Sequence, residues 1–75
     1  MFQRQRFDWK QALTNNVQQK LLSGETEISP LIIADVEKIL IQTALQKTSG
    51  RKNDAAKLLG WGRNTLTRKI KELEL

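Results

Sequence analysis

The chain has 75 residues, of which 13 are Lys or Arg, 8 are Asp or Glu and none is His or Cys. This length predicts one small domain with a limited core, for which dimerisation is a natural way to bury more apolar surface. Because His and Cys are absent, the chain offers no disulfide, no Ser-His-Asp or Cys-His arrangement and no usual zinc or copper ligands, so we expect neither an enzyme nor a metal or cofactor site.

The first predicted helix begins after Asp8, which suits the N-cap position. Apolar residues then recur at four-residue spacing, namely Trp9, Leu13, Val17 and Leu21. Ser23 and Gly24 end this helix, with Gly24 in the left-handed conformation, and a polar linker over residues 24–28 follows. Residues 1–7 show no periodicity, so we expect a frayed start.

The second predicted helix runs from Ser29 to about Thr48. The hydroxyl of Ser29 is expected to cap it, and Pro30 suits the first helical position. Two apolar stripes lie on this helix, on either side of a polar seam at Glu37 and Thr48. The broad stripe contains Ile32, Ile33, Val36, Ile39, Leu40 and Ala44, and the second contains Leu31, Ala34, Ile41 and Leu45.

A helix that is apolar on two sides needs two neighbours. In a chain this short, we expect one neighbour to be a second copy, with residues 8–48 as the dimerisation region of a single all-α domain. The predicted homodimer interface is the second stripe, made of Leu31, Ala34, Ile41 and Leu45. The alternative is that both stripes pack within one monomer. The most apolar stretch is interrupted by charges and is too short to cross a membrane, and the first residues show no apolar core typical of a signal peptide, so we expect a cytoplasmic protein.

Two short helices follow, over about residues 53–59 and 63–73. A tight turn with positive φ at Gly60 joins them, and Ala56 leaves room for the second helix to pack on the first. We expect Trp61 to fill the junction between the two helices; the alternative is that it stacks on a base. The residues that anchor the last helix on the core are Leu66, Ile70 and Leu73. This arrangement over residues 51–73 is the helix-turn-helix pattern.

The positive charge is concentrated in the same part of the chain. Residues 1–46 have no net charge, whereas residues 47–71 hold eight Lys and Arg and a single acidic residue, Asp54, for a net charge of +7. Such clustering is typical of a protein that binds nucleic acid; the alternative is a solvated basic surface. The residues expected to contact base edges in a major groove are Arg63, Asn64, Thr65, Thr67 and Arg68. Those expected to contact phosphates are Lys47, Arg51, Lys52, Lys57, Lys69 and Lys71.

Residues 50–73, GRKNDAAKLLGWGRNTLTRKIKEL, closely resemble the helix-turn-helix of NtrC-type nitrogen regulators and, more distantly, that of the Fis nucleoid protein. Weaker similarity extends back through VEKILIQTALQKTSG and the helix led by Trp9. The Fis-type contacts that the resemblance carries over are Arg51, Asn53, Arg63, Thr65, Thr67 and Arg68, and we count Asn53 among the phosphate contacts. Gly62 stands where Fis has a polar side chain and offers only a backbone N–H.

The resemblance implies a homodimeric module that binds a pseudo-palindromic enhancer on double-stranded DNA in the nucleoid of a bacterium. It also implies a longer two-component activator, whose receiver and ATPase domains act with sigma-54 RNA polymerase. The 75 residues contain no phosphate-binding loop ending in GK[ST], so we expect an isolated module. Two alternatives remain, namely a Fis-like architectural protein without a preferred operator and a helical protein-interaction module whose basic face meets an acidic partner.

Overall fold

The structure, a computed structural model, describes residues 8–75, and in that range it contains four helices and no strand. The helices are α1 (Trp9–Leu22), α2 (Ser29–Lys47), α3 (Lys52–Leu59) and α4 (Arg63–Glu72). The prediction of an all-α fold with a C-terminal helix-turn-helix is confirmed. The expected frayed start lies outside the described residues. Within the described part of the chain, no helix is long and apolar enough to cross a membrane.

Local signals set both ends of α1, as predicted. A carboxylate oxygen of Asp8 accepts hydrogen bonds from the backbone N–H groups of Lys10 at 3.0 Å and Gln11 at 3.4 Å, so Asp8 is the N-cap. At the other end Gly24 has a φ of +83°, the left-handed conformation that commonly follows a helix.

The start of α2 differs from the prediction. Ser29 is the first helical residue rather than the cap, and Ile28 occupies the N-cap position without a side-chain hydrogen bond. Pro30 lies in the first turn, where its missing N–H group costs nothing and its fixed φ suits a helix. The restricted backbone of Pro30 therefore favours the start of α2. No side-chain hydroxyl caps the helix at this end.

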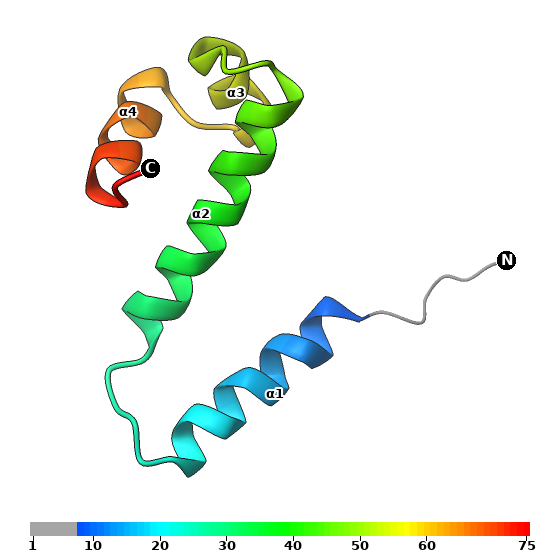
Figure 1. The fold of residues 1–75 in the computed structure, drawn as a ribbon, viewed down its shortest axis with the longest axis vertical. Coiled ribbons are helices and arrows are strands. Elements are labelled where there is room, and N and C mark those ends of the chain that lie inside the picture. Colours follow the sequence, from blue (N-terminus) through cyan, green and yellow to red (C-terminus); the bar gives the residue numbers. More distant parts are fainter. Residues whose placement is uncertain (1–7) are drawn as a thin grey trace, which may run out of the picture.

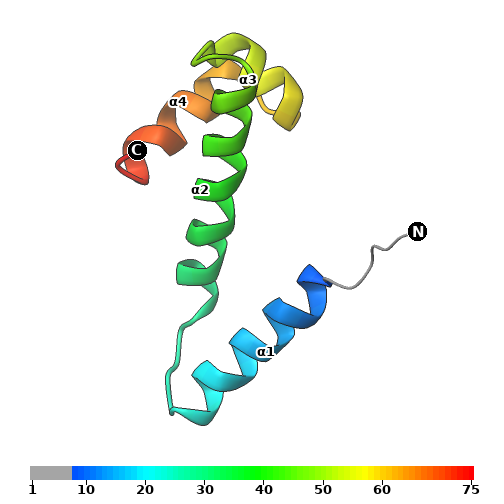
Figure 2. The same cartoon turned by 45° about the vertical axis from the view of Figure 1, so that its right-hand side comes forward.

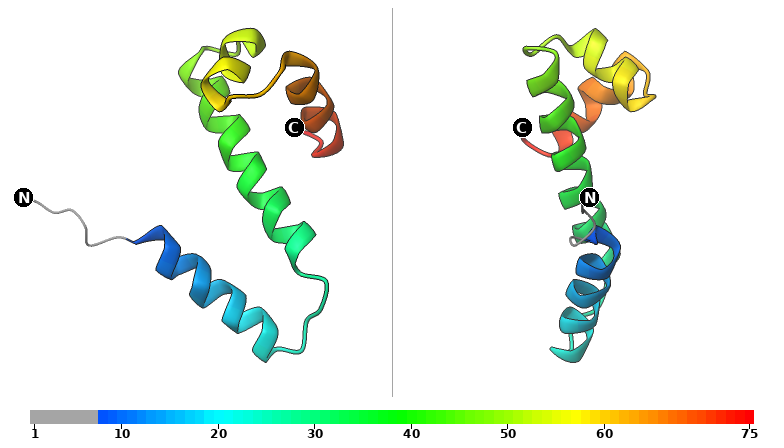
Figure 3. Two further views of the ribbon diagram at one scale, coloured as in Figure 1. Left: turned by 180° about the vertical axis from the view of Figure 1, so that it is seen from behind. Right: turned by 90° about the vertical axis from the view of Figure 1, so that its right-hand side faces the viewer.

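Helices α1 and α2 form a V whose apex is the linker between them (Figure 1). Helices α3 and α4 both lie beside the C-terminal half of α2, as the turned view also shows (Figure 2). The molecule is flat when seen edge-on (Figure 3), with extents of 40 × 39 × 16 Å and a Cα radius of gyration of 15.2 Å. A compact chain of this length has a radius of gyration of about 11 Å, so this fold leaves large helix surfaces without neighbours.

Among residues 8–75, the core lies only where α3 and α4 pack on α2. Its buried residues are Ile41, Ala44, Ala55, Ala56 and Leu66, and the side chains packed against them are Leu45, Leu59, Trp61, Ile70 and Leu73. The small side chains of Ala55 and Ala56 let α3 approach its neighbours closely. The roles predicted for Ala56 and Leu66 are confirmed, and Trp61 packs against the core between the two short helices, as predicted.

The two stripes of α2 have roles different from those predicted. Ile41, assigned to the dimer interface, is 0% exposed within a single chain, so that assignment is wrong. Leu45, its neighbour in the second stripe, packs against the same core. By contrast Ile39, in the broad stripe, is 63% exposed. The second stripe therefore faces α3 and α4 along the C-terminal half of α2. Most of the broad stripe is exposed, although its last residue, Ala44, is buried in the same core.

Helix length explains why the core stops halfway along α2. At 1.5 Å per residue, α2 is about 28 Å long, whereas α3 and α4 are about 12 and 15 Å long. The two short helices consequently cover one end of α2 and leave Leu31, at the other end, exposed. Ala34, one turn further on, is half-buried.

Candidate nucleic-acid interface

The turn between α3 and α4 sets the orientation of the last helix. Gly60 ends α3 with a φ of +77°, in the left-handed region, as predicted. The backbone N–H of Trp61 then donates to the carbonyl oxygen of Ala56 at 2.9 Å. Gly62 has extended backbone and is the N-cap of α4. Three residues between the helices, Gly60, Trp61 and Gly62, are thus enough to turn the chain from α3 into α4.

The polar seam of α2 holds this helix pair in place. Thr48 is buried, and its hydroxyl oxygen lies 3.0 Å from the carbonyl oxygen of Ala44 and 3.1 Å from that of Arg51, the residue before α3. Glu37 accepts a hydrogen bond from Lys69 of α4. Both residues were predicted to form a polar seam, but neither contact follows from the sequence pattern. The sequence feature that could have indicated these contacts is the pair of polar side chains that interrupts the apolar surface of α2.

A polar hollow of about 420 Å³ lies at the N-terminal ends of α3 and α4. Its lining residues are Gly50, Arg51, Lys52, Asn53, Asp54 and Arg63. It brings together Arg51, Asn53 and Arg63, three of the residues that the family resemblance assigns to DNA contacts. Neither helix has a side-chain cap at this end, so capping side chains do not occupy the backbone N–H groups of the first turns. Helix N-termini of this kind favour anionic oxygen atoms.

The remaining predicted base contacts lie on the outer surface of α4. Asn64, Thr67 and Arg68 are exposed, and Thr65 is half-buried. Nη1 of Arg68 lies 3.3 Å from both carboxylate oxygens of Glu72, one turn later in the helix. Both side chains of this pair are largely exposed, so it contributes little to stability and leaves Arg68 available to another acceptor.

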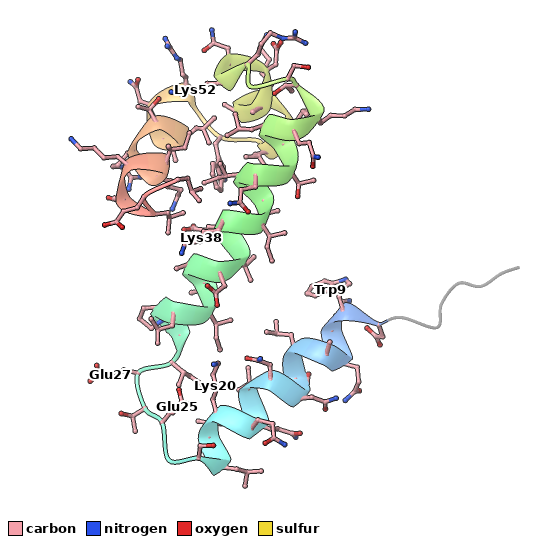
Figure 4. All side chains as sticks on the ribbon, in the orientation of Figure 1. Trp9, Lys20, Glu25, Glu27, Lys38 and Lys52 are labelled. Carbon is pink, nitrogen blue, oxygen red and sulfur yellow. The ribbon has the colours of Figure 1, made fainter. Side chains whose placement is uncertain are left out.

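Most of the predicted phosphate contacts are exposed around the hollow and on the flanking surfaces, namely Lys47, Arg51, Lys52, Asn53, Lys57 and Lys71. Nε of Arg51 donates to Asp54 at 2.9 Å, which holds the guanidinium over the first turn of α3. In Figure 4, Lys52 lies at the end of the molecule opposite the linker that carries Glu25 and Glu27. Lys52 of the basic segment is therefore well separated in space from the acidic side chains of the linker.

Lys69 differs from the other predicted phosphate contacts. Its Nζ atom lies 2.8 Å from Oε2 of Glu37, and both side chains are mostly covered. The same atom lies 5.5 Å from the ring centre of Trp61. Lys69 therefore points toward α2 and the turn, and its assignment as a phosphate contact is corrected.

An apolar surface on the inner side of the V was not singled out from the sequence. A hollow of about 400 Å³ there is lined by Trp9, Leu13, Val36, Ile39 and Leu40. Trp9 lies at the open end of the V (Figure 4) and is largely exposed. In the sequence, the four-residue spacing in α1 and the broad stripe in α2 each indicate an apolar helix surface. That these two surfaces face each other follows only from the packing of the helices.

Comparison with known proteins places these features in a family. Residues 32–73, which include all of α3 and α4, match the family described as bacterial regulatory protein, Fis family. No solved structure gives a significant match.

The similar curated proteins are bacterial regulators and DNA-binding proteins. Over 65 residues, or 87% of this chain, the sequence is 46% identical to the DNA-binding transcriptional regulator NtrC of Escherichia coli K12 and 48% identical to that of Proteus hauseri. It is 38% identical to the DNA-binding protein Fis of Vibrio cholerae over 84% of this chain. The chain spans 14% of the length of these NtrC proteins and 64% of that of Fis. With most of its length matched, including the whole helix-turn-helix, the chain belongs to the Fis family of bacterial regulatory proteins.

Proposed function

We propose that this chain is a DNA-binding module that recognises a pseudo-palindromic site on double-stranded DNA as a homodimer. The observation that carries the proposal is the polar hollow where Arg51, Asn53 and Arg63 meet at the uncapped ends of two helices. Cationic side chains and unoccupied backbone N–H groups at one place suit a phosphate backbone and the base edges beside it.

In this proposal α4 enters the major groove with its N-terminal end foremost. Arg63 and Arg68 have the planar fork that binds guanine, and Asn64 has the amide that binds adenine. The hydroxyl and methyl groups of Thr65 and Thr67 contact neighbouring positions. The flanking Lys side chains and Arg51 bind phosphates, which supplies most of the affinity and makes it depend on salt.

The homodimer is proposed to form through the inner side of the V. Val36, Ile39 and Leu40 of α2 and Trp9 of α1 together leave apolar surface uncovered, and the radius of gyration exceeds that of a compact chain. Burying this surface against a second copy would place two α4 helices on one face of a symmetric dimer. A two-fold dimer of this kind reads two half-sites about 34 Å apart.

The wider role is inferred from the similar NtrC regulators. We propose that the module belongs to a nitrogen-regulation activator of two-component type, in which a receiver and an ATPase domain act with sigma-54 RNA polymerase in the bacterial cytoplasm. The higher identity to NtrC than to Fis favours a specific operator over sequence-independent binding.

The proposal is tested by fluorescence anisotropy at about 0.15 M salt. The chain is titrated against an NtrC-type enhancer palindrome and against a shuffled duplex of equal composition. We expect the palindrome to bind about a thousandfold more tightly. Equal and strongly salt-dependent binding to both duplexes would indicate an architectural protein, which selection from a random library would check. Absence of binding would indicate a protein-interaction module.

A further inference from the structure

One ion pair connects the last helix directly to the long helix α2. Nζ of Lys69 and Oε2 of Glu37 are 2.8 Å apart although 32 positions separate the two residues. Their side chains are 21% and 22% exposed. The other two ion pairs within residues 8–75, Arg51 with Asp54 and Arg68 with Glu72, are local, exposed pairs. In the described part of the chain, the pair of Lys69 and Glu37 is therefore the only ion pair that joins two helices.

The ammonium group of Lys69 has a second partner in the turn. It lies 5.5 Å from the ring centre of Trp61, a geometry in which a cation is attracted to the face of the ring. Trp61 itself packs against the buried core. One cation thus links α4, the turn before it and α2.

The position of Lys69 in α4 agrees with this inward orientation. Lys69 follows Leu66 by three residues and precedes Leu73 by four, so it shares their face of the helix. Leu66 is buried and Leu73 packs on the core. Arg68 is two residues from Leu66, which places it on a different face.

We propose that Lys69 and Glu37 are positioning residues, which set the orientation of α4 on α2 and so determine sequence preference without contacting DNA. The apolar contacts of Leu66 and Ile70 hold α4 against the core but are non-directional. A charged hydrogen bond depends on distance and angle and therefore opposes rotation of α4 over those contacts. This inference rests on the proposed DNA-binding function.

The orientation of α4 matters more for base contacts than for phosphate contacts. A bidentate contact between Arg63 and guanine requires both groups in one plane, whereas a flexible Lys chain follows a displaced phosphate. Loss of the pair should therefore lower the affinity for a preferred sequence while largely sparing non-specific affinity.

The test compares Glu37→Gln with Glu25→Gln, a matched control in the exposed linker. Each change removes one negative charge, which by electrostatics alone tightens binding to any DNA. We expect Glu37→Gln instead to weaken binding to the palindrome about tenfold, with less than about twofold change on the shuffled duplex. Glu25→Gln should leave the ratio of the two affinities unchanged. An unchanged ratio in Glu37→Gln overturns the proposal.

A second pair of variants separates positioning from phosphate binding. Lys71→Met removes an exposed Lys of α4 and should weaken both duplexes equally, lowering the salt dependence by about 0.9 in the slope of log K against log salt. Lys69→Met should keep the wild-type slope and lose affinity for the palindrome alone. A reduced slope with equal losses on both duplexes would make Lys69 a phosphate contact and overturn its positioning role.

Amide hydrogen exchange of the free protein gives a readout that does not need DNA. We expect faster exchange in α4, and unchanged exchange in α1, for both Glu37→Gln and Lys69→Met. Circular dichroism checks that both variants remain helical. If the wild-type chain shows no sequence preference, the proposed function fails, while faster exchange confined to α4 still supports the positioning pair. Unchanged exchange in α4 overturns it.

Discussion

The hydroxyl oxygen of Thr48 lies 3.1 Å from the carbonyl oxygen of Arg51, a contact that joins the end of α2 to the residue just before α3. This side chain is buried at the point where the long helix meets the helix-turn-helix. Together with Glu37, it makes the polar seam of α2 the attachment site for both short helices. The part of the molecule that carries the candidate DNA contacts is thus oriented by polar contacts as well as by its small apolar core.

Thr48→Val keeps the shape of the side chain and removes the hydroxyl. The backbone N–H of Ala55 also donates to the carbonyl of Arg51, so no buried acceptor is left without a partner. We therefore expect the free energy of unfolding to fall by about 1 kcal/mol, the usual net value of one hydrogen bond. Urea unfolding measures this loss. Thr48→Ser retains the hydroxyl but loses the buried methyl group, so the wild type is the reference. A valine variant as stable as the wild type would contradict the role of the hydrogen bond.

Ile39→Asp tests the proposed dimer surface. Ile39 is exposed in a single chain, so a charge there should leave the monomer folded while opposing burial against a second copy. Sedimentation should show a shift from dimer to monomer. Gln42→Asp, which places the same charge at an exposed polar position of α2, is the control. If both variants associate equally, the inner side of the V is not the dimer interface.

Ile41→Ala should affect folding rather than association. The side chain is fully buried in the core shared by α2, α3 and α4, so its truncation leaves a cavity. We expect a loss of about 2–5 kcal/mol in the free energy of unfolding, measured by thermal or urea unfolding. If Ile41→Ala is folded and stable but monomeric, Ile41 belongs to the dimer interface after all.

Arg63→Ala tests base recognition. The residue lines the polar hollow at the start of α4, and loss of a bidentate contact should cost about 1–3 kcal/mol on the preferred sequence and flatten sequence preference. Anisotropy titrations on the palindrome and the shuffled duplex measure both effects. Lys57→Ala, at an exposed predicted phosphate contact, should weaken both duplexes alike. An equal loss on both duplexes in Arg63→Ala would reassign Arg63 to phosphate binding.

Gly60→Ala tests the turn. An added Cβ would meet no atom within 4 Å, so any loss comes from the φ of +77° and not from a steric clash with neighbouring atoms. We expect a loss of about 1 kcal/mol in the free energy of unfolding. Gly60→Asn should lose less, because Asn tolerates the left-handed region better than Ala. Equal stability of the alanine variant and the wild type would mean that the turn adopts another conformation.

Features that depend on near neighbours in the sequence could be predicted. The cap at Asp8 and the left-handed glycines Gly24 and Gly60 follow from side-chain and backbone properties of single residues. Ala56 and Leu66 were identified as core residues because helical spacing and side-chain size limit what fits between two short helices. The concentration of positive charge in the helix-turn-helix is likewise a direct property of the sequence.

The sequence by itself thus determined the four helices, their approximate bounds and the segment that carries the candidate DNA contacts, although not the cap of α2. The tertiary structure alone decided that Ile41 faces the core while Ile39 faces the V, and that Lys69 pairs with Glu37 instead of remaining exposed. Spacing within α2 reveals two apolar stripes but not which neighbour covers each, because that depends on the lengths and crossing angles of other helices. A contact between residues 32 positions apart exists only once those helices have packed.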